Sequence, residues 1–201
     1  MGIGNPGRQY ERTRHNVGFW VVDRLCERAG VELRKKGFEA RYAYVSSGPG
    51  GEPACFAEPQ TYVNLTGEAV RGLADFYKVA PEGVLVVCDD LNLPVGKLRI
   101  RRDGSSGGHK GLDSVIRALG TNAFPRLRIG IGQAPPFMDS ADYVLAPPAK
   151  EEREALDEAV KRAVEAVEMW LADGVERAMA RYNAKDAKDA KDAKTDTEAK
   201  E

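Results

Sequence analysis

The spacing of hydrophobic residues in the first third of the chain predicts two helices with two strands between them. Apolar side chains recur at the helical period over residues 17–29, and Asn16 stands where it can cap that helix. Residues 38–47 and 54–57 are typical of strands, and the sequence GPGGEP between them is typical of a turn. The second helix is expected to begin with Asn64 as its cap. Its predicted buried face consists of Ala69, Leu73, Phe76 and Tyr77.

The rest of the chain continues this alternation. Residues 84–88 form a wholly apolar run and predict a central, buried strand. Residues 97–102 alternate in polarity, which places Leu98 and Ile100 inside and the basic side chains outside. The remaining predicted elements are a helix over 110–119, a strand over 127–131, and helical sequence over 150–183 that is broken near 173–174. Strands interleaved with helices indicate the α/β class, here a single domain with a twisted mixed β-sheet surrounded by helices.

Length and composition bear on the domain organisation. The chain has 201 residues, 42% of them hydrophobic, which is enough for one sizeable core. Residues 1–183 are therefore predicted to form one domain. Residues 184–194 repeat Ala-Lys-Asp with a period of three, which drifts around a helix and builds no sustained apolar face. We expect residues 184–201 to be a charged, low-complexity, disordered tail without catalytic content.

Charge and cysteine content exclude several classes of protein. A formal net charge of −1 argues against a histone-like nucleic-acid binder, but the basic residues are segregated. They cluster at Lys97, Arg99, Arg101 and Arg102, and again at Arg126 and Arg128. Three cysteines without a CxxC pair predict reduced thiols rather than a disulfide framework or a zinc site. No apolar run approaches the ~20 residues that span a bilayer and no signal segment opens the chain, so we expect a cytoplasmic protein without a membrane partner.

Three short motifs carry the candidate chemistry. GIGNPGRQYERTRHNVG contains Asn5, Tyr10 and one of only two histidines, His15. PQTYVNLTG carries Asn64, and VLVVCDDLNLP places Asp89 at the end of an apolar strand. A histidine, a carboxylate and two amides are the groups that activate a water and hold an amide-bearing substrate.

Each of these residues also has a structural interpretation, which is favoured when the residue is taken singly. Asn5 suits a turn, Asn64 a helix cap, Asp89 a capped turn and His15 a surface loop. Only their joint appearance in order favours the functional interpretation. For the second histidine, His109, the sequence favours a structural role in a loop.

Other chemistries rank lower. The two histidines and Asp89 are the donors of a two-histidine, one-carboxylate metal site, but they lack close ligand spacing, so no metal is predicted. Neither Ser105 nor Ser106 lies in a GxSxG nucleophile elbow. Cys88 lies inside an apolar strand, where an inert thiol is expected.

The glycines at the start of the chain match a dinucleotide-binding fingerprint, Gly2-x-Gly4-x-x-Gly7. That pattern requires a strand before it and a helix directly after it, and neither is predicted here. A tight turn is the better interpretation, so a dinucleotide-dependent oxidoreductase is a weak alternative.

Taken together and in order, the motifs resemble those of the bacterial peptidyl-tRNA hydrolase family. The resemblance runs from residue 2 to about residue 183 through GIGNPGxxYxxTRHNxG, NLTG, DDLNLPxGKLRIR, SSGGHKGLxS, RLRIGIG and EMWLADGVERAMARYNA. It implies a peptidyl-tRNA hydrolase-like catalytic domain that cleaves the ester between a peptide and the 3′ ribose of tRNA. The partner is then peptidyl-tRNA, no cofactor is needed, and a monomer is the family expectation.

The resemblance also implies a role for each matching residue. His15 corresponds to the catalytic histidine and Asp89 to the residue that orients it. Asn5 and Asn64 match the amides that place the peptide and the attacking water. Tyr10 matches an aromatic residue beside the site.

Two further regions take their expected roles from the family. The region implicated in binding tRNA phosphates matches Lys97, Arg99, Arg101 and, beyond them, Arg128. Lys110 in GGHKG stands where many members carry asparagine, and we expect it to contact the substrate as a hydrogen-bond donor only.

The residue types suit ester hydrolysis. An ester is already an activated acyl group, so a neutral imidazole that takes a proton from water is sufficient and typically contributes ~10²–10⁴-fold. A carboxylate on the other ring nitrogen fixes the tautomer and stabilises the imidazolium that forms.

Two expectations go beyond the site. Relatives of this fold include RNA-associated proteins, so a non-catalytic binding module of the same fold is the main alternative function. Family members also carry an apolar strand before the GxGNPG turn, so we expect a first strand that is missing or truncated, and a short apolar extension upstream of Met1.

Overall fold

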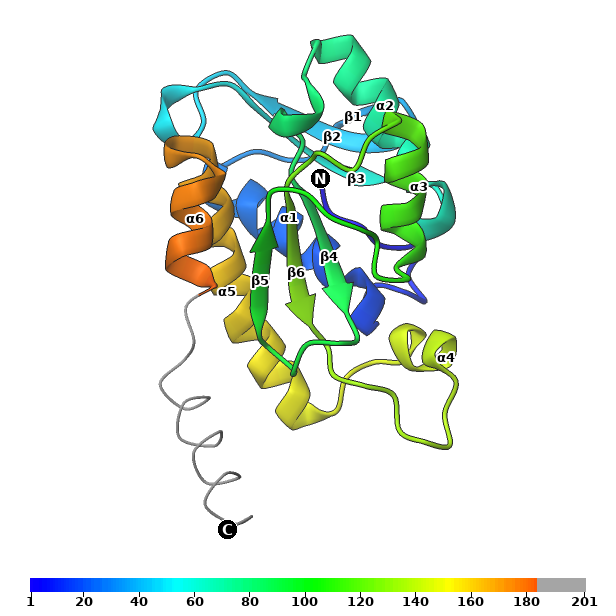
Figure 1. Cartoon of the computed structure of the whole chain (residues 1–201). Helices are drawn as coiled ribbons and strands as arrows, with labels where there is room; N and C mark the ends of the chain where they lie inside the picture. The colour runs from blue at the N-terminus through cyan, green and yellow to red at the C-terminus, as the bar shows by residue number, and fades with distance from the viewer. Residues whose placement is uncertain (184–201) are drawn as a thin grey trace.

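Two small sheets organise the chain in the computed structural model, which describes residues 1–183 (Figure 1). The antiparallel first sheet consists of β1 (Lys35–Gly37), β2 (Ala40–Val45) and β3 (Ala54–Pro59). The second sheet has the order β4-β6-β5, formed by β4 (Val86–Asp90), β6 (Arg126–Gly130) and β5 (Leu98–Arg101). Because β4 and β6 run parallel while β5 and β6 run antiparallel, this sheet is mixed, as the sequence predicts.

Helices surround the two sheets. The long ones are α1 (Val17–Ala29), α2 (Thr66–Tyr77), α3 (Lys110–Leu119) and α5 (Lys150–Asp173). The shorter ones are α4 (Ser140–Leu145), α6 (Val175–Tyr182) and the 3₁₀ turns η1 (Arg14–Asn16), η2 (Pro49–Gly51), η3 (Val63–Leu65) and η4 (Pro81–Gly83). The predicted break near residue 174 is confirmed, since Gly174 separates α5 from α6. No helix within residues 1–183 combines the length and apolar character needed to cross a membrane.

Two elements were missing from the sequence-based prediction. β1 has three exposed residues, and α4 has six residues of which only Tyr143 is buried. Neither element is long enough to show an apolar period. Pairing with β2 defines β1, and the Asp139 cap marks the start of α4.

The hydrophobic core lies on both faces of β4. Val87 joins the cluster formed with α1 and α5, while Val86 and Cys88 join the cluster formed with α2 and α3. All five residues of β4 are buried, which confirms the predicted burial, but β6 rather than β4 is the middle strand of the sheet. Because both faces of β4 are buried, the strand has a fixed position, and so do Asp89 and Asp90 at its end.

Residues 1–3 link the two sheets. Gly2 forms an isolated parallel bridge with Val87, and its N–H donates to the carbonyl of Ala57 in β3 at 3.1 Å. A Cβ on Gly2 would lie 2.2 Å from the carbonyl oxygen of Gly18, so glycine is needed for this close approach to α1. Residues 1–3 thus pair with β4 through one isolated bridge, and Gly2 serves the close packing of this segment on α1. The predicted tail, residues 184–201, lies outside the described residues.

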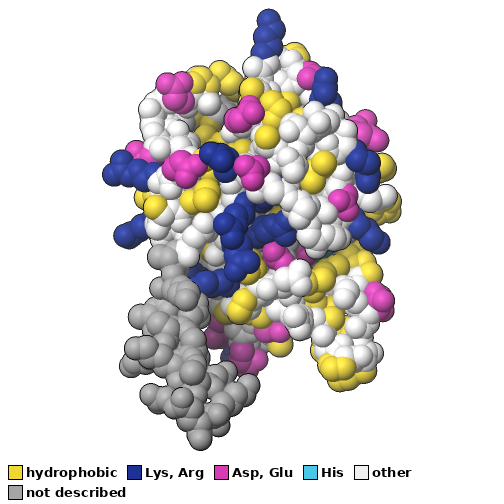
Figure 2. All heavy atoms as spheres, viewed as in Figure 1, with side chains coloured by type: hydrophobic (Ala, Val, Ile, Leu, Met, Phe, Trp, Pro, Cys, Tyr) yellow, Lys and Arg dark blue, Asp and Glu magenta, His cyan; other side chains and the backbone are white. Residues whose placement is uncertain are grey.

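The two faces of the second sheet differ in polarity. Leu98 and Ile100 of β5, with Leu127 and Ile129 of β6, pack into the core beside α1 and α5. Arginines occupy the opposite face at the alternating positions Arg99, Arg101, Arg126 and Arg128. Figure 2 shows Lys and Arg side chains gathered over this part of the molecule.

Candidate active site

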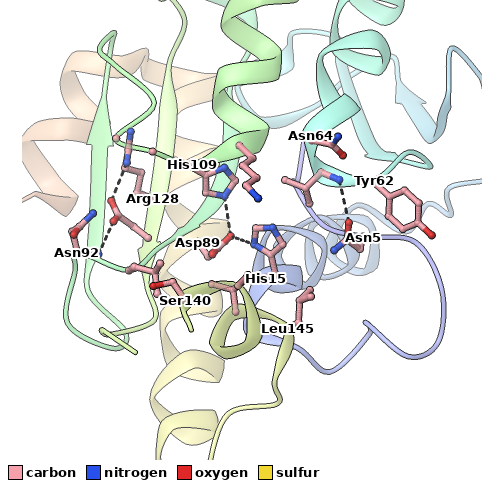
Figure 3. Close-up of a pocket in the computed structure, with 18 of the residues that line it drawn as sticks. Asn5, His15, Tyr62, Asn64, Asp89, Asn92, His109, Arg128, Ser140 and Leu145 are labelled. Atoms are coloured by element: carbon pink, nitrogen blue, oxygen red, sulfur yellow. Dashed lines mark hydrogen bonds and ion pairs between the residues drawn. The ribbon is translucent and has the colours of Figure 1, made fainter. Parts of the chain in front are cut away.

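A cavity of about 550 Å³ opens at the carboxyl end of β4, beside η1 and the N-terminus of α3 (Figure 3). Strand ends of this kind are where open α/β sheets bind ligands. The predicted site residues that line it are Asn5, Tyr10, His15, Asn64, Asp89, Lys110 and Arg128. The basic residues Lys97, Arg99 and Arg101 do not line the cavity and lie on or just before β5.

His15 and Asp89 form the centre of the cavity. The His15 Nδ1 lies 2.8 Å from the Asp89 Oδ1, and both side chains are largely buried. Burial alone would lower the pKa of His15, but the charge and hydrogen bond of Asp89 outweigh it and raise this pKa above its usual value. Burial would likewise raise the pKa of Asp89, but the two histidines hold it well below its usual range. Asp89 is therefore a carboxylate, as an orienting partner must be.

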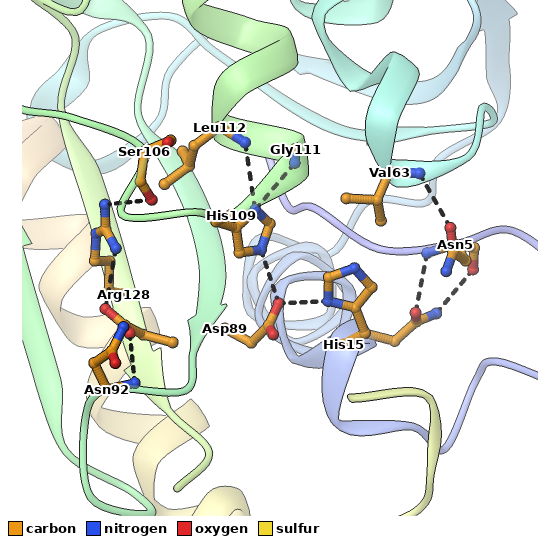
Figure 4. A network of polar contacts seen from close by, with 12 residues as sticks. Asn5, His15, Val63, Asp89, Asn92, Ser106, His109, Gly111, Leu112 and Arg128 are labelled. Carbon is orange, nitrogen blue, oxygen red and sulfur yellow. Dashed lines mark hydrogen bonds and ion pairs between the residues drawn. The ribbon is translucent and has the colours of Figure 1, made fainter. Parts of the chain in front are cut away.

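His109 also contacts this centre, so its interpretation as a structural loop residue alone was incomplete. Its Nε2 lies 3.0 Å from the same Asp89 oxygen, and its Nδ1 accepts from the backbone N–H groups of Gly111 and Leu112 (Figure 4). Accepting two hydrogen bonds at Nδ1 leaves the hydrogen on Nε2, which donates to Asp89. His109 thus caps α3 and orients the carboxylate at the same time. The sequence signal for the cap was the position of His109 directly before the helix predicted to begin at residue 110.

The hydrogen bonds of His109 also bear on metal binding. Ligand atoms of His15, Asp89 and His109 lie within 4.8 Å of one another, which corrects the view that they lack close spacing. A metal on the Nε2 of a neutral His109 would move its hydrogen to Nδ1, where it would face two backbone donors. The network therefore fits a carboxylate that accepts from two histidines better than a metal ion.

Asn16 and Val63 hold Asn5 in place. The Asn16 side chain accepts from the Asn5 N–H at 3.0 Å and donates to the Asn5 carbonyl at 2.9 Å. The Asn5 Oδ1 in turn accepts from the Val63 N–H at 3.1 Å. Asn16 is the N-cap of α1 by position, yet its side chain makes no cap hydrogen bond, because Asn5 occupies it. The prediction that the Asn16 side chain caps α1 is thus wrong. Asn16 instead holds Asn5, whose side-chain amide nitrogen remains available to the cavity.

The prediction that Asn64 caps α2 was also wrong. Asn64 lies inside η3, and Leu65 is the N-cap residue of α2, without a side-chain cap bond. Asn64 is exposed and lines the cavity together with Tyr62, which is 61% exposed. The amide is therefore free to meet a ligand.

α4 supplies a wall that sequence reasoning missed. Ser140, Ala141, Val144 and Leu145 line the cavity on the side opposite η3, and Leu145 is 38% exposed (Figure 3). This wall is more apolar than the His15 side, so the cavity can take both a polar backbone and apolar side chains.

Lys110 is the first residue of α3 and lines the cavity as an exposed cation. No hydrogen bond or ion pair to its ammonium is present within residues 1–183. Its charge opposes the effect of Asp89 and tends to lower the pKa of His15.

The arginines of β6 bind the protein itself. Arg128 forms an ion pair with Asp90 at 3.1 Å and donates to the carbonyls of Ser105 and Ser106. Arg126 is buried and donates to the carbonyls of Gly104, Ser105, Asn122 and Phe124. Both hold the glycine-rich loop before His109, and Arg126 is not a surface residue.

Arg99 and Arg101 differ from the β6 arginines. Both are exposed on β5, opposite Arg128 and Arg126 in the strand register, and neither has an ion pair within the described residues. They are the residues of the basic strand that are available to an external anion.

The candidate nucleophiles of the weaker alternatives are unsuitable. Burial raises the pKa of the Cys88 thiol well above its usual value, which confirms an inert thiol. The Ser106 hydroxyl accepts from the N–H of Gly108, with no histidine bonded to it.

Comparisons with known proteins agree with this geometry. The family model described as Peptidyl-tRNA hydrolase matches residues 1–191. A relative named Peptidyl-tRNA hydrolase from Symbiobacterium thermophilum is 46% identical over 183 residues, covering 91% of this chain and 97% of its own. One of the same name from Chloroflexus aurantiacus is 48% identical over 184 residues, with the same two coverages. The crystal structure of peptidyl-tRNA hydrolase from Acinetobacter baumannii superposes with a TM-score of 0.85 at 33% identity, covering 91% of this chain and 92% of that one. The chain belongs to the peptidyl-tRNA hydrolase family.

Proposed function

We propose that the cavity holds the ester end of peptidyl-tRNA and that His15 activates the water that hydrolyses this ester. The observation that carries the proposal is the orientation of the His15 ring. Its Nδ1–H donates to Asp89, while its Nε2 has no partner within residues 1–183 and points into the cavity (Figure 4). A neutral imidazole held in this tautomer is a general base aimed at the substrate.

The reaction balances with the groups present. The water oxygen attacks the ester carbonyl carbon while its proton passes to the His15 Nε2, and Asp89 stabilises the imidazolium that forms. The bond from the carbonyl carbon to the ribose 3′ oxygen then breaks, and the imidazolium returns the proton to that oxygen. The products are a tRNA with a free 3′ hydroxyl and a peptide with a carboxylic acid, which releases its proton to solvent and becomes a carboxylate.

The amides and the lysine would bind the peptide. Because the Asn5 Oδ1 is used by Val63, its amide nitrogen is a donor toward a peptide or ester carbonyl. Asn64 offers both a donor and an acceptor, and Lys110 offers only donors. Tyr10 would pack beside the bound chain. A donor near the ester carbonyl also supports the oxyanion that develops during attack.

Phosphates of the tRNA would bind the outer face of β5. Arg99 and Arg101 are exposed and project from the same face, next to the cavity mouth that Arg128 borders. Lys97 at the start of the strand extends this basic row. The guanidinium of Arg128 is already bound to Asp90 and the glycine-rich loop. Its proposed contribution is therefore to the positive electrostatic potential at the mouth of the cavity rather than a direct phosphate contact.

We infer a catalytic domain over residues 1–183 with a non-catalytic extension over 184–201, acting as a monomer. Because peptidyl-tRNA arises in translation, we place the protein in the cytoplasm.

The alternative of a non-catalytic RNA-binding module is not favoured. The relatives are named as hydrolases, and the His15–Asp89–His109 network leaves one nitrogen directed at the cavity. A protein that only bound RNA would not need a histidine in this tautomer.

Release of free tRNA from purified peptidyl-tRNA tests the proposal. Wild-type protein should convert the substrate fully, and His15→Ala should bind it with similar affinity without converting it. Binding without release by the wild-type protein would support the non-catalytic alternative instead.

A further inference from the structure

Arg14, the residue before His15, is bound almost entirely to one distant segment of the chain. It is 6% exposed, and its Nη1 donates to the carbonyls of Tyr143, Ala146 and Pro147 at 3.1–3.2 Å. Its Nη2 lies 2.6 Å from the Glu152 carboxylate. Its guanidinium also stacks over the Tyr143 ring, 4.0 Å from the centroid. All of these contacts are to the end of α4 and the start of α5.

This segment carries the α4 wall of the cavity, which has few other attachments. Tyr143 is the only buried residue of α4, and its hydroxyl donates to the Ile131 carbonyl at 2.8 Å. The other anchor is Arg14, whose backbone N–H also donates to the Ala146 carbonyl at 3.2 Å. The apolar attachment of this six-residue helix is limited to buried Tyr143 and half-buried Val144, which pack against the core, so its position also depends on these polar contacts.

We propose that Arg14 is a positioning residue, which fixes α4 relative to the His15 imidazole and so sets how tightly the cavity holds the peptide. Arg14 and His15 are adjacent in η1. The Arg14 side chain binds the end of α4, and the His15 side chain binds Asp89. The turn η1 therefore fixes the distance between the α4 wall of the cavity and the general base. This inference rests on the proposed placement of the peptide in the cavity.

The contacts require arginine rather than any cation. A planar guanidinium can serve three carbonyls and a carboxylate at once and still stack on an aromatic ring. Lysine keeps the charge opposite Glu152 but offers a single compact ammonium that cannot span this set of acceptors. Arg14→Lys is therefore the informative substitution, because it retains the buried charge balance and loosens only the geometry.

The test measures KM and kcat for peptidyl-tRNAs that share one tRNA and differ in peptide length. For Arg14→Lys we expect KM to rise about fivefold or more with the longer peptides and less with a single N-acetylated amino acid. The value of kcat and its pH dependence should stay near wild type, since His15 keeps its contact with Asp89. Tyr143→Phe, which loses the hydroxyl contact to Ile131 and keeps Arg14, should change KM in the same direction if Arg14→Lys does not fold.

Two control variants separate the possible outcomes. Val160→Ala, in the core on α5, lowers stability without removing any of the hydrogen bonds that Arg14 and Tyr143 make, so it should leave KM unchanged for every substrate. Leu145→Ala alters the wall itself and should raise KM. If Leu145→Ala raises KM while Arg14→Lys and Tyr143→Phe behave like Val160→Ala, the role of Arg14 is overturned and the placement of the peptide stands. If Leu145→Ala also leaves KM unchanged, the peptide does not contact this wall and both ideas fail.

Discussion

The walls of the cavity and the outer face of β5 hold their polar groups in opposite ways. Inside the cavity, Asp89 is 2% exposed and accepts from two histidines, and Asn5 is bonded on three of its polar atoms. On β5, Arg99 and Arg101 are exposed, with no ion pair within the described residues.

This difference matches two different functions, proton transfer in the cavity and attraction of a polyanion on β5. A group that moves a proton has to be held in one tautomer at one position, and buried hydrogen bonds provide that. A group that attracts a polyanion needs only charge at its surface, and such attraction is long-range and screened by salt. We therefore expect variants of the cavity to change kcat and its pH dependence, and variants of β5 to change KM and its salt dependence.

Removal of the general base is the strongest test of this separation. His15→Ala should lower kcat by at least ~10²-fold, because the attacking water then loses the imidazole that takes its proton, while KM changes little. Single-turnover release of tRNA measures the effect without interference from product release. Near-wild-type turnover by this variant would show that the cavity does not carry the chemistry.

The Asp89→Asn variant should shift the pH profile as well as the rate. Asp89 holds the pKa of His15 above its usual value, and activity requires neutral His15, so wild-type activity falls as the pH drops through that raised pKa. Without the carboxylate charge, burial dominates and lowers this pKa, so the acidic limb should move to lower pH. The maximal rate should fall by less than in His15→Ala. An acidic limb that stays in place would contradict the assignment of Asp89.

A pair of variants at His109 separates its two contacts. His109→Ala removes the cap of α3, which typically costs ~1 kcal/mol, together with the hydrogen bond to Asp89. His109→Asn can restore the cap but is too short to replace the ring between α3 and Asp89. We expect both variants to lose about tenfold in kcat, and the alanine variant to lose more stability than the asparagine variant because it also lacks the cap. Thermal melts recorded beside the kinetics check this, and full activity of His109→Asn would reduce His109 to a cap.

The sequence predicts the parts of this molecule that depend on neighbours along the chain. The apolar stripe of α1 and the wholly apolar run over residues 84–88 were enough to place those elements and to put Asp89 at a strand end. The role of His109 was missed because it depends on the approach of η1 to the start of α3, which no local pattern encodes. The same holds for Arg128, whose partners come from the end of β4 and a loop more than twenty residues earlier.

Arginines on β5 should show the opposite behaviour to the cavity residues. The double substitution Arg99→Ala with Arg101→Ala should raise KM for peptidyl-tRNA and leave the hydrolysis of a short minimal ester unchanged. Each lost phosphate contact should reduce the slope of log affinity against log salt by about 0.7–0.9. Binding measured over a series of salt concentrations checks this. An unchanged slope would mean that these arginines are solvated surface residues without a role in tRNA binding.

Lys110 shares features with both the cavity residues and the β5 arginines, and its variants should give the smallest effects on activity. It is an exposed cation like Arg99, yet it lines the cavity and tends to lower the pKa of His15. Lys110→Asn should retain or improve activity near pH 8, because an amide can both donate to the peptide and accept from it. Loss of the cation should raise the pKa of His15, so the acidic limb should move slightly to higher pH in both Lys110→Asn and Lys110→Ala. Only Lys110→Ala should also weaken peptide binding, by a few-fold in KM. Identical KM values and identical pH profiles for wild type and both variants would place Lys110 outside the working site.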